Sequence, residues 1–144
     1  MSNQIRPLAI CLFRNGDRIL VGEGYDPVKR KPFYRPLGGG IEFGERAEQT
    51  IPREIREEIG AEVTSLEYLF TLENIFTFNG KPGHEIVMVY DGRLADEGLY
   101  RQKIIEGQEF DGFRQSMLKA VWKRLEEFGP GAPLYPNGLL ERLK

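Results

Sequence analysis

The sequence predicts a mixed α/β (α+β) fold built mainly from strands, with one amphipathic helix inserted between them. Runs of β-branched and other apolar residues recur along the chain at the length of strands. Ile51, Ile55 and Ile59 are spaced four residues apart, as on one face of an α-helix. The chain has 144 residues, 40% of them apolar, which suits one globular domain over residues 1–144.

Strands and turns are expected in the first third of the chain. Residues 5–13 predict a strand, Asn15-Gly16-Asp17 is a turn signal, and residues 18–22 predict a second strand that pairs back on the first. Residues 25–36 hold three prolines and are expected to form a loop. Gly38-Gly39-Gly40 is expected to be a turn that exposes its backbone.

The helix is expected to end at Ile59, because Gly60 stands where a capping glycine belongs. Pro52 complicates its start, since a proline inside a helix removes one hydrogen bond and costs about 3 kcal/mol. We therefore expect the regular helix to start late, with Thr50 as its N-cap, or to bend near Pro52. A straight helix from Ala47 through Ile59 would contradict this expectation.

Strands also dominate the prediction for the rest of the chain. Residues 63–78 predict one or two strands, residues 85–94 one strand, and residues 118–122 the last strand. The segments between them are expected to be a turn at 79–83 and an irregular stretch at 95–115, and short helical candidates lie at 125–128 and 139–143.

Composition narrows the partners and the compartment. The formal net charge is -2 and the overall balance is acidic, so we expect no nucleic-acid-binding face. Leu8 to Phe13 is too short an apolar run for a signal peptide or a membrane span. Cys11 is the single cysteine, which is expected to be a buried structural residue and which suits a reducing compartment. We expect a soluble, cytoplasmic protein without a membrane partner.

Three carboxylates fall on one side of the predicted helix. Glu54, Glu57 and Glu58 lie within an arc of about 100°, where like charges repel unless a cation lies among them. Mg²⁺ prefers such oxygen ligands, and Mn²⁺ could replace it. A solvated acidic face is the commoner explanation for such a run. The basic residues of Lys29–Lys31 and Arg35 lie shortly before the helix and suit phosphate.

The residues before the helix make the metal hypothesis stronger. From Gly39 the chain runs five residues to Glu45 and seven more to Arg53, followed by Glu54-Ile55-Arg56-Glu57-Glu58-Ile59-Gly60. This spacing resembles the sequence box of the Nudix (MutT-like) hydrolase family over residues 39–61. Every fixed position of that box is filled, and Ala61 is smaller than the usual final aliphatic residue.

The resemblance implies an α/β/α sandwich with a mixed sheet, in which the box forms a loop, a helix and a loop. It implies that Glu54, Glu57 and Glu58 bind Mg²⁺, with the carbonyl of Gly38 or Gly39 and the carboxylate of Glu45 as further candidates. The catalytic candidates are Glu54, Arg53 and Glu57, with Arg53 orienting the catalytic glutamate.

Residues outside the box are candidates for the general base and for substrate binding. Glu54 is the first candidate for the base, and His84, Glu85 and Glu109 are the reserve. Arg35 and Lys29 could bind substrate phosphates. Tyr34 and Phe76, with Phe78, could stack on a nucleobase, and His84 could contact the substrate. Core positions are the commoner role for aromatic residues in apolar strands, and Phe43 and Trp122 are expected to pack there.

The predicted function is Mg²⁺-dependent hydrolysis of the pyrophosphate linkage in a nucleoside diphosphate joined to another moiety. ADP-ribose, nucleotide sugars, nucleoside triphosphates and dinucleoside polyphosphates all remain open as substrates. The alternative is a non-catalytic nucleotide-binding or regulatory module on the same fold. The oligomeric state stays open, and analogy with the family offers a homodimer as one option.

Overall fold

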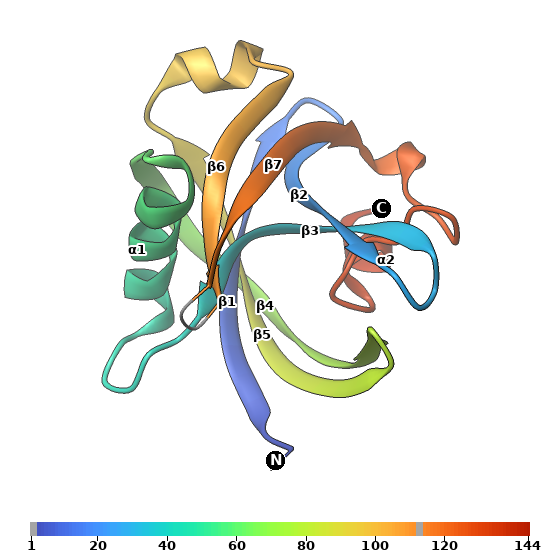
Figure 1. Ribbon diagram of the computed structural model, residues 1–144. Helices are drawn as coiled ribbons and strands as arrows, with labels where there is room; N and C mark the ends of the chain where they lie inside the picture. The colour runs from blue at the N-terminus through green and yellow to red at the C-terminus, as the bar shows by residue number, and fades with distance from the viewer. Residues whose placement is uncertain (1–2, 112–113) are drawn as a thin grey trace.

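The computed structural model describes residues 3–111 and 114–144, which form a seven-stranded mixed sheet and two α-helices (Figure 1). The strand order across the sheet is β4-β5-β1-β3-β2-β7-β6. The strands are β1 (Ile5–Asn15), β2 (Arg18–Asp26), β3 (Lys31–Gly40), β4 (Val63–Phe78), β5 (Lys81–Leu94), β6 (Ile104–Asp111) and β7 (Arg114–Arg124). The helices are α1 (Ala47–Ile59) and α2 (Leu139–Leu143), with 3-10 turns η1 (Glu97–Arg101) and η2 (Leu125–Glu127).

The central strand β1 explains why the sheet is covered on both faces. It runs parallel to β5 and antiparallel to β3, and its apolar run is continuous because both of its faces are buried. One set of its side chains packs with α1: Ala9, Cys11 and Phe13. The alternate set packs with α2: Leu8, Ile10 and Leu12. The predicted sandwich of a mixed sheet between helices is therefore confirmed (Figure 1).

The predicted late start of the helix is wrong. Helix α1 is continuous from Ala47 to Ile59, with Pro52 inside it. The Gln49 side chain accepts a hydrogen bond from the Arg46 backbone N–H at 2.8 Å, which caps the first turn in place of Thr50. Burial of Ile51 and Ile55 at 0% exposure holds the helix to the sheet on both sides of the proline. The predicted Gly60 cap is confirmed, with φ at 66°. A bend of the axis near Pro52 stays a prediction.

The expected loop at 25–36 is wrong except for a turn at 27–30, and the expected glycine turn at 38–40 is wrong, because the other residues belong to β2 and β3. Strand β3 pairs with β2 up to Pro36 and with β1 from Leu37 onward. A proline lacks the N–H of a sheet hydrogen bond, and it is tolerated where one side of the strand is unpaired. The true turn is shorter, at residues 27–30, and Asp26 caps it by accepting the N–H groups of Val28 and Lys29.

The remaining elements follow the prediction more closely. The turn between β4 and β5 is shorter than expected, since β5 begins at Lys81. The stretch 95–115, expected to be irregular, contains η1 and β6, which pairs with β7 as an edge of the sheet. Trp122 packs on Tyr100 as expected, with 5.1 Å between the ring centroids, whereas Phe43 is fully exposed. Among the described residues, each helix is too short or too polar to cross a membrane.

Candidate active site

Glycines let the end of β3 approach helix α1 closely. A Cβ atom on Gly39 would fall 2.5 Å from the Glu54 carboxyl carbon, and one on Gly38 would fall 2.2 Å from the Ala9 carbonyl oxygen. Gly38 also has a φ of +147°, which side-chain-bearing residues rarely adopt. The glycine run therefore places Glu54 against the β3 backbone, and the first residues of the box act through packing and not as an open turn.

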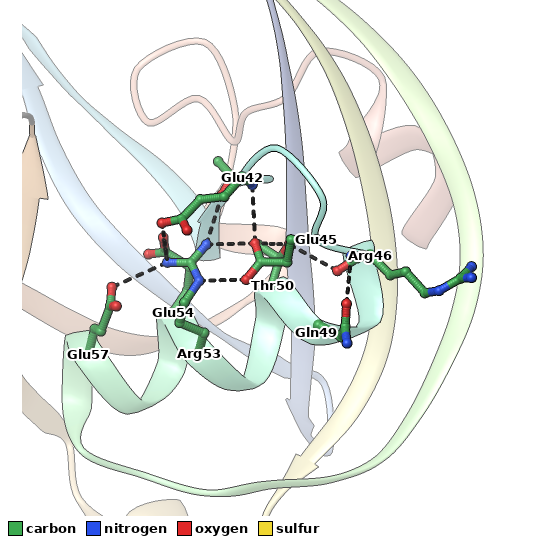
Figure 2. A network of polar contacts seen from close by, with 9 residues as sticks. Glu42, Glu45, Arg46, Gln49, Thr50, Arg53, Glu54 and Glu57 are labelled. Carbon is green, nitrogen blue, oxygen red and sulfur yellow. Dashed lines mark hydrogen bonds and ion pairs between the residues drawn. The ribbon is translucent and has the colours of Figure 1, made fainter.

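Arg53 is the centre of a polar network that joins the loop before α1 to the helix (Figure 2). Its guanidinium donates to both carboxylate oxygens of Glu45, at 2.7 and 2.9 Å, and to the Gly40 carbonyl at 3.0 Å. It also donates to Glu54 at 2.9 Å and to Glu57 at 3.4 Å. The Arg53 hydrogen bonds are the main cause that lowers the pKa of Glu45 to about 2. Arg53 thus fixes both the loop carboxylate and Glu54.

Glu54 is partly buried and Glu58 is buried, and the two carboxylates have different partners. Burial raises the pKa of Glu54, and its hydrogen bond to Arg53 opposes that shift. Glu58 is 7% exposed, and its Oε1 atom has no hydrogen-bond partner within the described part of the chain. Burial raises the pKa of Glu58 to about 9, and the charges of Glu54 and Glu109 add to the rise. A second negative charge beside Glu54 is therefore unfavourable unless a cation lies close to both carboxylates.

The third predicted carboxylate is placed differently. The side chain of Glu57 is 45% exposed and contacts Arg53, as Figure 2 shows. Within residues 3–111 and 114–144, no group of three acidic, histidine or cysteine side chains lies close enough together to hold a metal ion. Arg53 pairs with Glu54 and Glu57 here, so the predicted convergence of all three carboxylates is not seen in this arrangement.

A cleft of about 450 Å³ opens beside Glu54 and Glu58. Its lining residues come from all seven strands, from α1 and from the segment that contains Pro133 and Tyr135. Among the predicted site residues it is lined by Glu54, Glu58, Gly39, Arg35, Lys29, Phe76, Glu85 and Glu109. The volume is in the range of sites for small molecules.

Other predicted residues lie outside this cleft. Tyr34 is 8% exposed and packs in the α2-side core against Phe128, with the Lys123 ammonium 4.7 Å from its ring, so it cannot stack on a ligand. His84 lies between Ile5 and Ile75 across the strands and does not line the cleft. Glu45, Arg53 and Glu57 do not line the cleft, although Arg53 contacts the lining residue Glu54.

Sequence reasoning missed several residues that line the cleft: Arg6, Phe33, Asn74, Ser116 and Tyr135. They come from separate strands and from the C-terminal segment, so no local spacing joins them. Phe33 lies in the segment that was expected to be a loop. In a strand, Phe33 and Arg35 are two residues apart and lie on the same face, which could have indicated that both line one site.

The model of the NUDIX domain family matches residues 4–138. The chain belongs to this family. Its relatives include an NAD-capped RNA hydrolase of Pseudomonas aeruginosa, 39% identical over 66 residues, which are 46% of this chain and 23% of that protein. An NAD(P)H pyrophosphatase of Homo sapiens is 42% identical over 65 residues, which are 45% of this chain and 18% of that protein. The Nudix chain thus spans a quarter or less of the length of these two relatives.

Solved structures support the Nudix fold. The crystal structure of a MutT NUDIX hydrolase from Burkholderia pseudomallei superposes with a TM-score of 0.66 at 22% identity, covering 99% of this chain and 100% of that one. At that identity the likeness concerns the fold. The prediction of a Nudix hydrolase is confirmed at the level of the family.

Proposed function

We propose that this Nudix chain hydrolyses the pyrophosphate linkage of a nucleoside diphosphate joined to a second moiety, with a divalent metal ion as cofactor. The observation that carries the proposal is the buried carboxylate of Glu58 beside Glu54 at the wall of the cleft. The intact box of residues 39–61 and the membership of the family support it.

The donor groups fit a hard divalent cation. A buried carboxylate oxygen without a partner is costly, and a nearby cation offsets that cost. Carboxylate and carbonyl oxygens are the ligands that Mg²⁺ prefers, and Mn²⁺ overlaps with it. Glu54 and Glu58 would hold the ion, and Glu57 would join them once it leaves Arg53, with the Gly39 carbonyl and Glu45 as further donors. When bound, the ion would neutralise phosphate charge and lower the pKa of coordinated water.

The chain's own residues then divide the remaining work. The oxygen of a water molecule forms a bond to one phosphorus atom while the bond from that phosphorus to the bridging oxygen breaks. Glu54 takes the proton of that water, and Arg53 keeps the Glu54 carboxylate in position. Arg35 and Lys29 line the cleft and bind phosphate oxygens. Glu109 is the second candidate for the base, because it lines the same cleft and its charge acts on Glu58.

The second moiety of the substrate is suggested by the relatives. One relative is named for NAD-capped RNA and another for NAD(P)H, and NAD(P)H is a dinucleotide that contains a pyrophosphate. We therefore include NADH among the substrates to be compared with ADP-ribose, a nucleotide sugar and nucleoside triphosphates.

The test is hydrolysis of this panel with and without Mg²⁺, with products separated by chromatography. We expect turnover that requires the metal and falls at least about a hundredfold in Glu54→Gln, the magnitude of a lost general base. Glu62→Gln on the surface, where Glu62 pairs with Arg56, is the matched control and keeps its activity. Binding of a nucleotide without turnover would favour the non-catalytic module instead, and turnover in EDTA would contradict the metal dependence.

A further inference from the structure

The residues that line the cleft change from carboxylates near α1 to aromatic rings near the tips of the β2–β3 and β4–β5 hairpins. Glu54 and Glu58 stand at the α1 end. Arg35 follows: its charge acts on Glu58, and its Nη2 atom lies 3.9 Å from the Glu85 carboxylate. Glu85 and its partner Asn74 come next. The far end of the cleft is aromatic, formed by Phe33, Phe76, Phe78 and Tyr135.

Glu85 is a buried carboxylate whose position is fixed. Glu85 and Asn74 are each 4% exposed, and the Asn74 amide donates to Glu85 Oε1 at 3.2 Å. The side-chain Oδ1 atom of Asn74 in turn accepts a hydrogen bond from the backbone N–H of Asn137 at 3.0 Å, which sets the direction of the Asn74 side-chain amide. An ionised carboxylate accepts hydrogen bonds and donates none. Glu85 therefore presents a rigid acceptor to a ligand in the cleft.

The aromatic end is preformed. The Phe33 ring packs edge-on against the rings of Phe78 and Tyr135, with centroid distances of 5.5 and 5.9 Å. A Cβ atom on Gly24 would fall 2.3 Å from the Phe33 ring, so this ring lies across the backbone of the neighbouring strand. The same relation holds for Phe76 and its partner Gly83. Aromatic faces of this kind suit a planar heterocycle.

A hydrogen bond between the two hairpin tips supports this arrangement. Asp26, at the end of β2, accepts the backbone N–H of Asn79 at the turn between β4 and β5, at 3.3 Å. This hydrogen bond joins the tips of the β2–β3 and β4–β5 hairpins, which lie on the same side of the molecule in Figure 1. The length available to a ligand that starts at Glu54 is limited by this contact.

We propose that Glu85 binds the ribose hydroxyl groups of the substrate and makes this chain select ribonucleotides over 2′-deoxyribonucleotides. The inference rests on the proposed function, which places the phosphates beside Glu54 and Arg35. In a nucleotide the sugar lies between phosphate and base, and Glu85 lies between Arg35 and the aromatic rings. A carboxylate is the acceptor that pairs with the hydroxyl groups of ribose in dinucleotide sites.

Calorimetric binding in EDTA tests the proposal without hydrolysis. The ligands are adenosine, guanosine and cytidine 5′-monophosphate, each beside its 2′-deoxy form. For the base that binds best, we expect the ribonucleotide to bind at least about tenfold more tightly, the effect of a hydrogen bond to a charged group. Glu85→Gln lowers this ratio several-fold, and Glu85→Ala brings it to about one.

The matched control is Glu73→Gln, an exposed glutamate on β4 next to Asn74 but outside the cleft, and it keeps the wild-type ratio. Thermal unfolding of each variant shows that it is folded. Equal binding of both sugars by the wild type, discrimination that survives in Glu85→Ala, or no binding of any mononucleotide would overturn the proposal. If the wild type prefers ribonucleotides but shows no Mg²⁺-dependent turnover, only the proposed hydrolysis is contradicted.

Discussion

At the scale of single residues, two arginines on α1 make ion pairs of different kinds. Arg53 is part of a network that includes both oxygens of Glu45, the Gly40 carbonyl and Glu54. Arg56 makes a surface pair with Glu62, in which both side chains are about three-fifths exposed, at 61% and 60%. Exposed pairs of that kind contribute little, whereas a forked guanidinium that joins several groups cannot be replaced by an ammonium.

Arg53→Lys should therefore reduce kcat by about 10- to 100-fold, because lost hydrogen bonds between charged groups leave Glu54 poorly positioned. The Mg²⁺-dependent rate on the best substrate of the panel measures the change. Arg56→Lys is the matched control on the same helix, and we expect its rate to stay within about twofold of the wild type. Equal rates in both variants would show that the network does not position the catalytic carboxylate.

Glu45 gives a prediction of how stability depends on pH. Its pKa is about 2 in the folded chain against an ordinary value of 4.5. Because the folded value is the lower one, ionised Glu45 stabilises the fold above about pH 4.5, and this stabilisation disappears as the pH falls toward 2. Urea unfolding should show a gap between wild type and Glu45→Gln that is widest near pH 6 and narrows in acid. A gap that is the same at every pH would contradict the assignment.

At the scale of secondary-structure elements, Pro52 shows where helical periodicity outweighs a local helix breaker. Ile51 and Ile55 are fully buried. The first turn is held by the hydrogen bond from the Arg46 N–H to Gln49 and by the one from the Thr50 hydroxyl to Glu45. These tertiary contacts offset the hydrogen bond that Pro52 cannot make. The isoleucine spacing and Gly60 predicted the helix and its end, whereas the predicted N-cap is wrong because Gln49, at the third helical position, caps the first turn.

Pro52→Ala should accordingly stabilise the protein by about 1–2 kcal/mol. The gain is smaller than the full helical penalty of about 3 kcal/mol, because alanine also increases the entropy of the unfolded chain. Urea unfolding at neutral pH measures the difference. Unchanged or reduced stability would show that the helix is already relaxed around the proline.

Strand β3 shows the limit of prediction from local patterns. Its prolines and basic residues are typical of a loop, yet it pairs with β2 and then with β1, and each proline stands where this change of partner leaves one side unpaired. No local pattern indicates a change of partner, which depends on strands distant in the sequence. The same error hid Phe33, whereas Arg35 was found through its charge.

At the scale of the whole molecule, the box could be predicted and the cleft could not. The acidic positions of residues 39–61 follow from spacing within one segment. The ribose-facing and aromatic parts of the cleft combine side chains from β3, β4, β5 and the C-terminal segment, which meet only through the sheet topology. Glu85 was predicted as a reserve base, and its place between Arg35 and the aromatic residues became apparent only in the fold.

Metal binding should appear in the stability of the entire fold, because Glu58 is part of the packed interior. A ligand that binds the folded state stabilises it by about 2.7 kcal/mol at a concentration 100 times its Kd. For a chain of this size that raises Tm by roughly 5–10 °C. We expect Mg²⁺ to produce such a shift in the wild type, and Glu58→Gln to abolish most of it while the variant stays folded without metal. Glu62→Gln should keep the shift, and an equal shift in both variants would exclude Glu58 from the metal site.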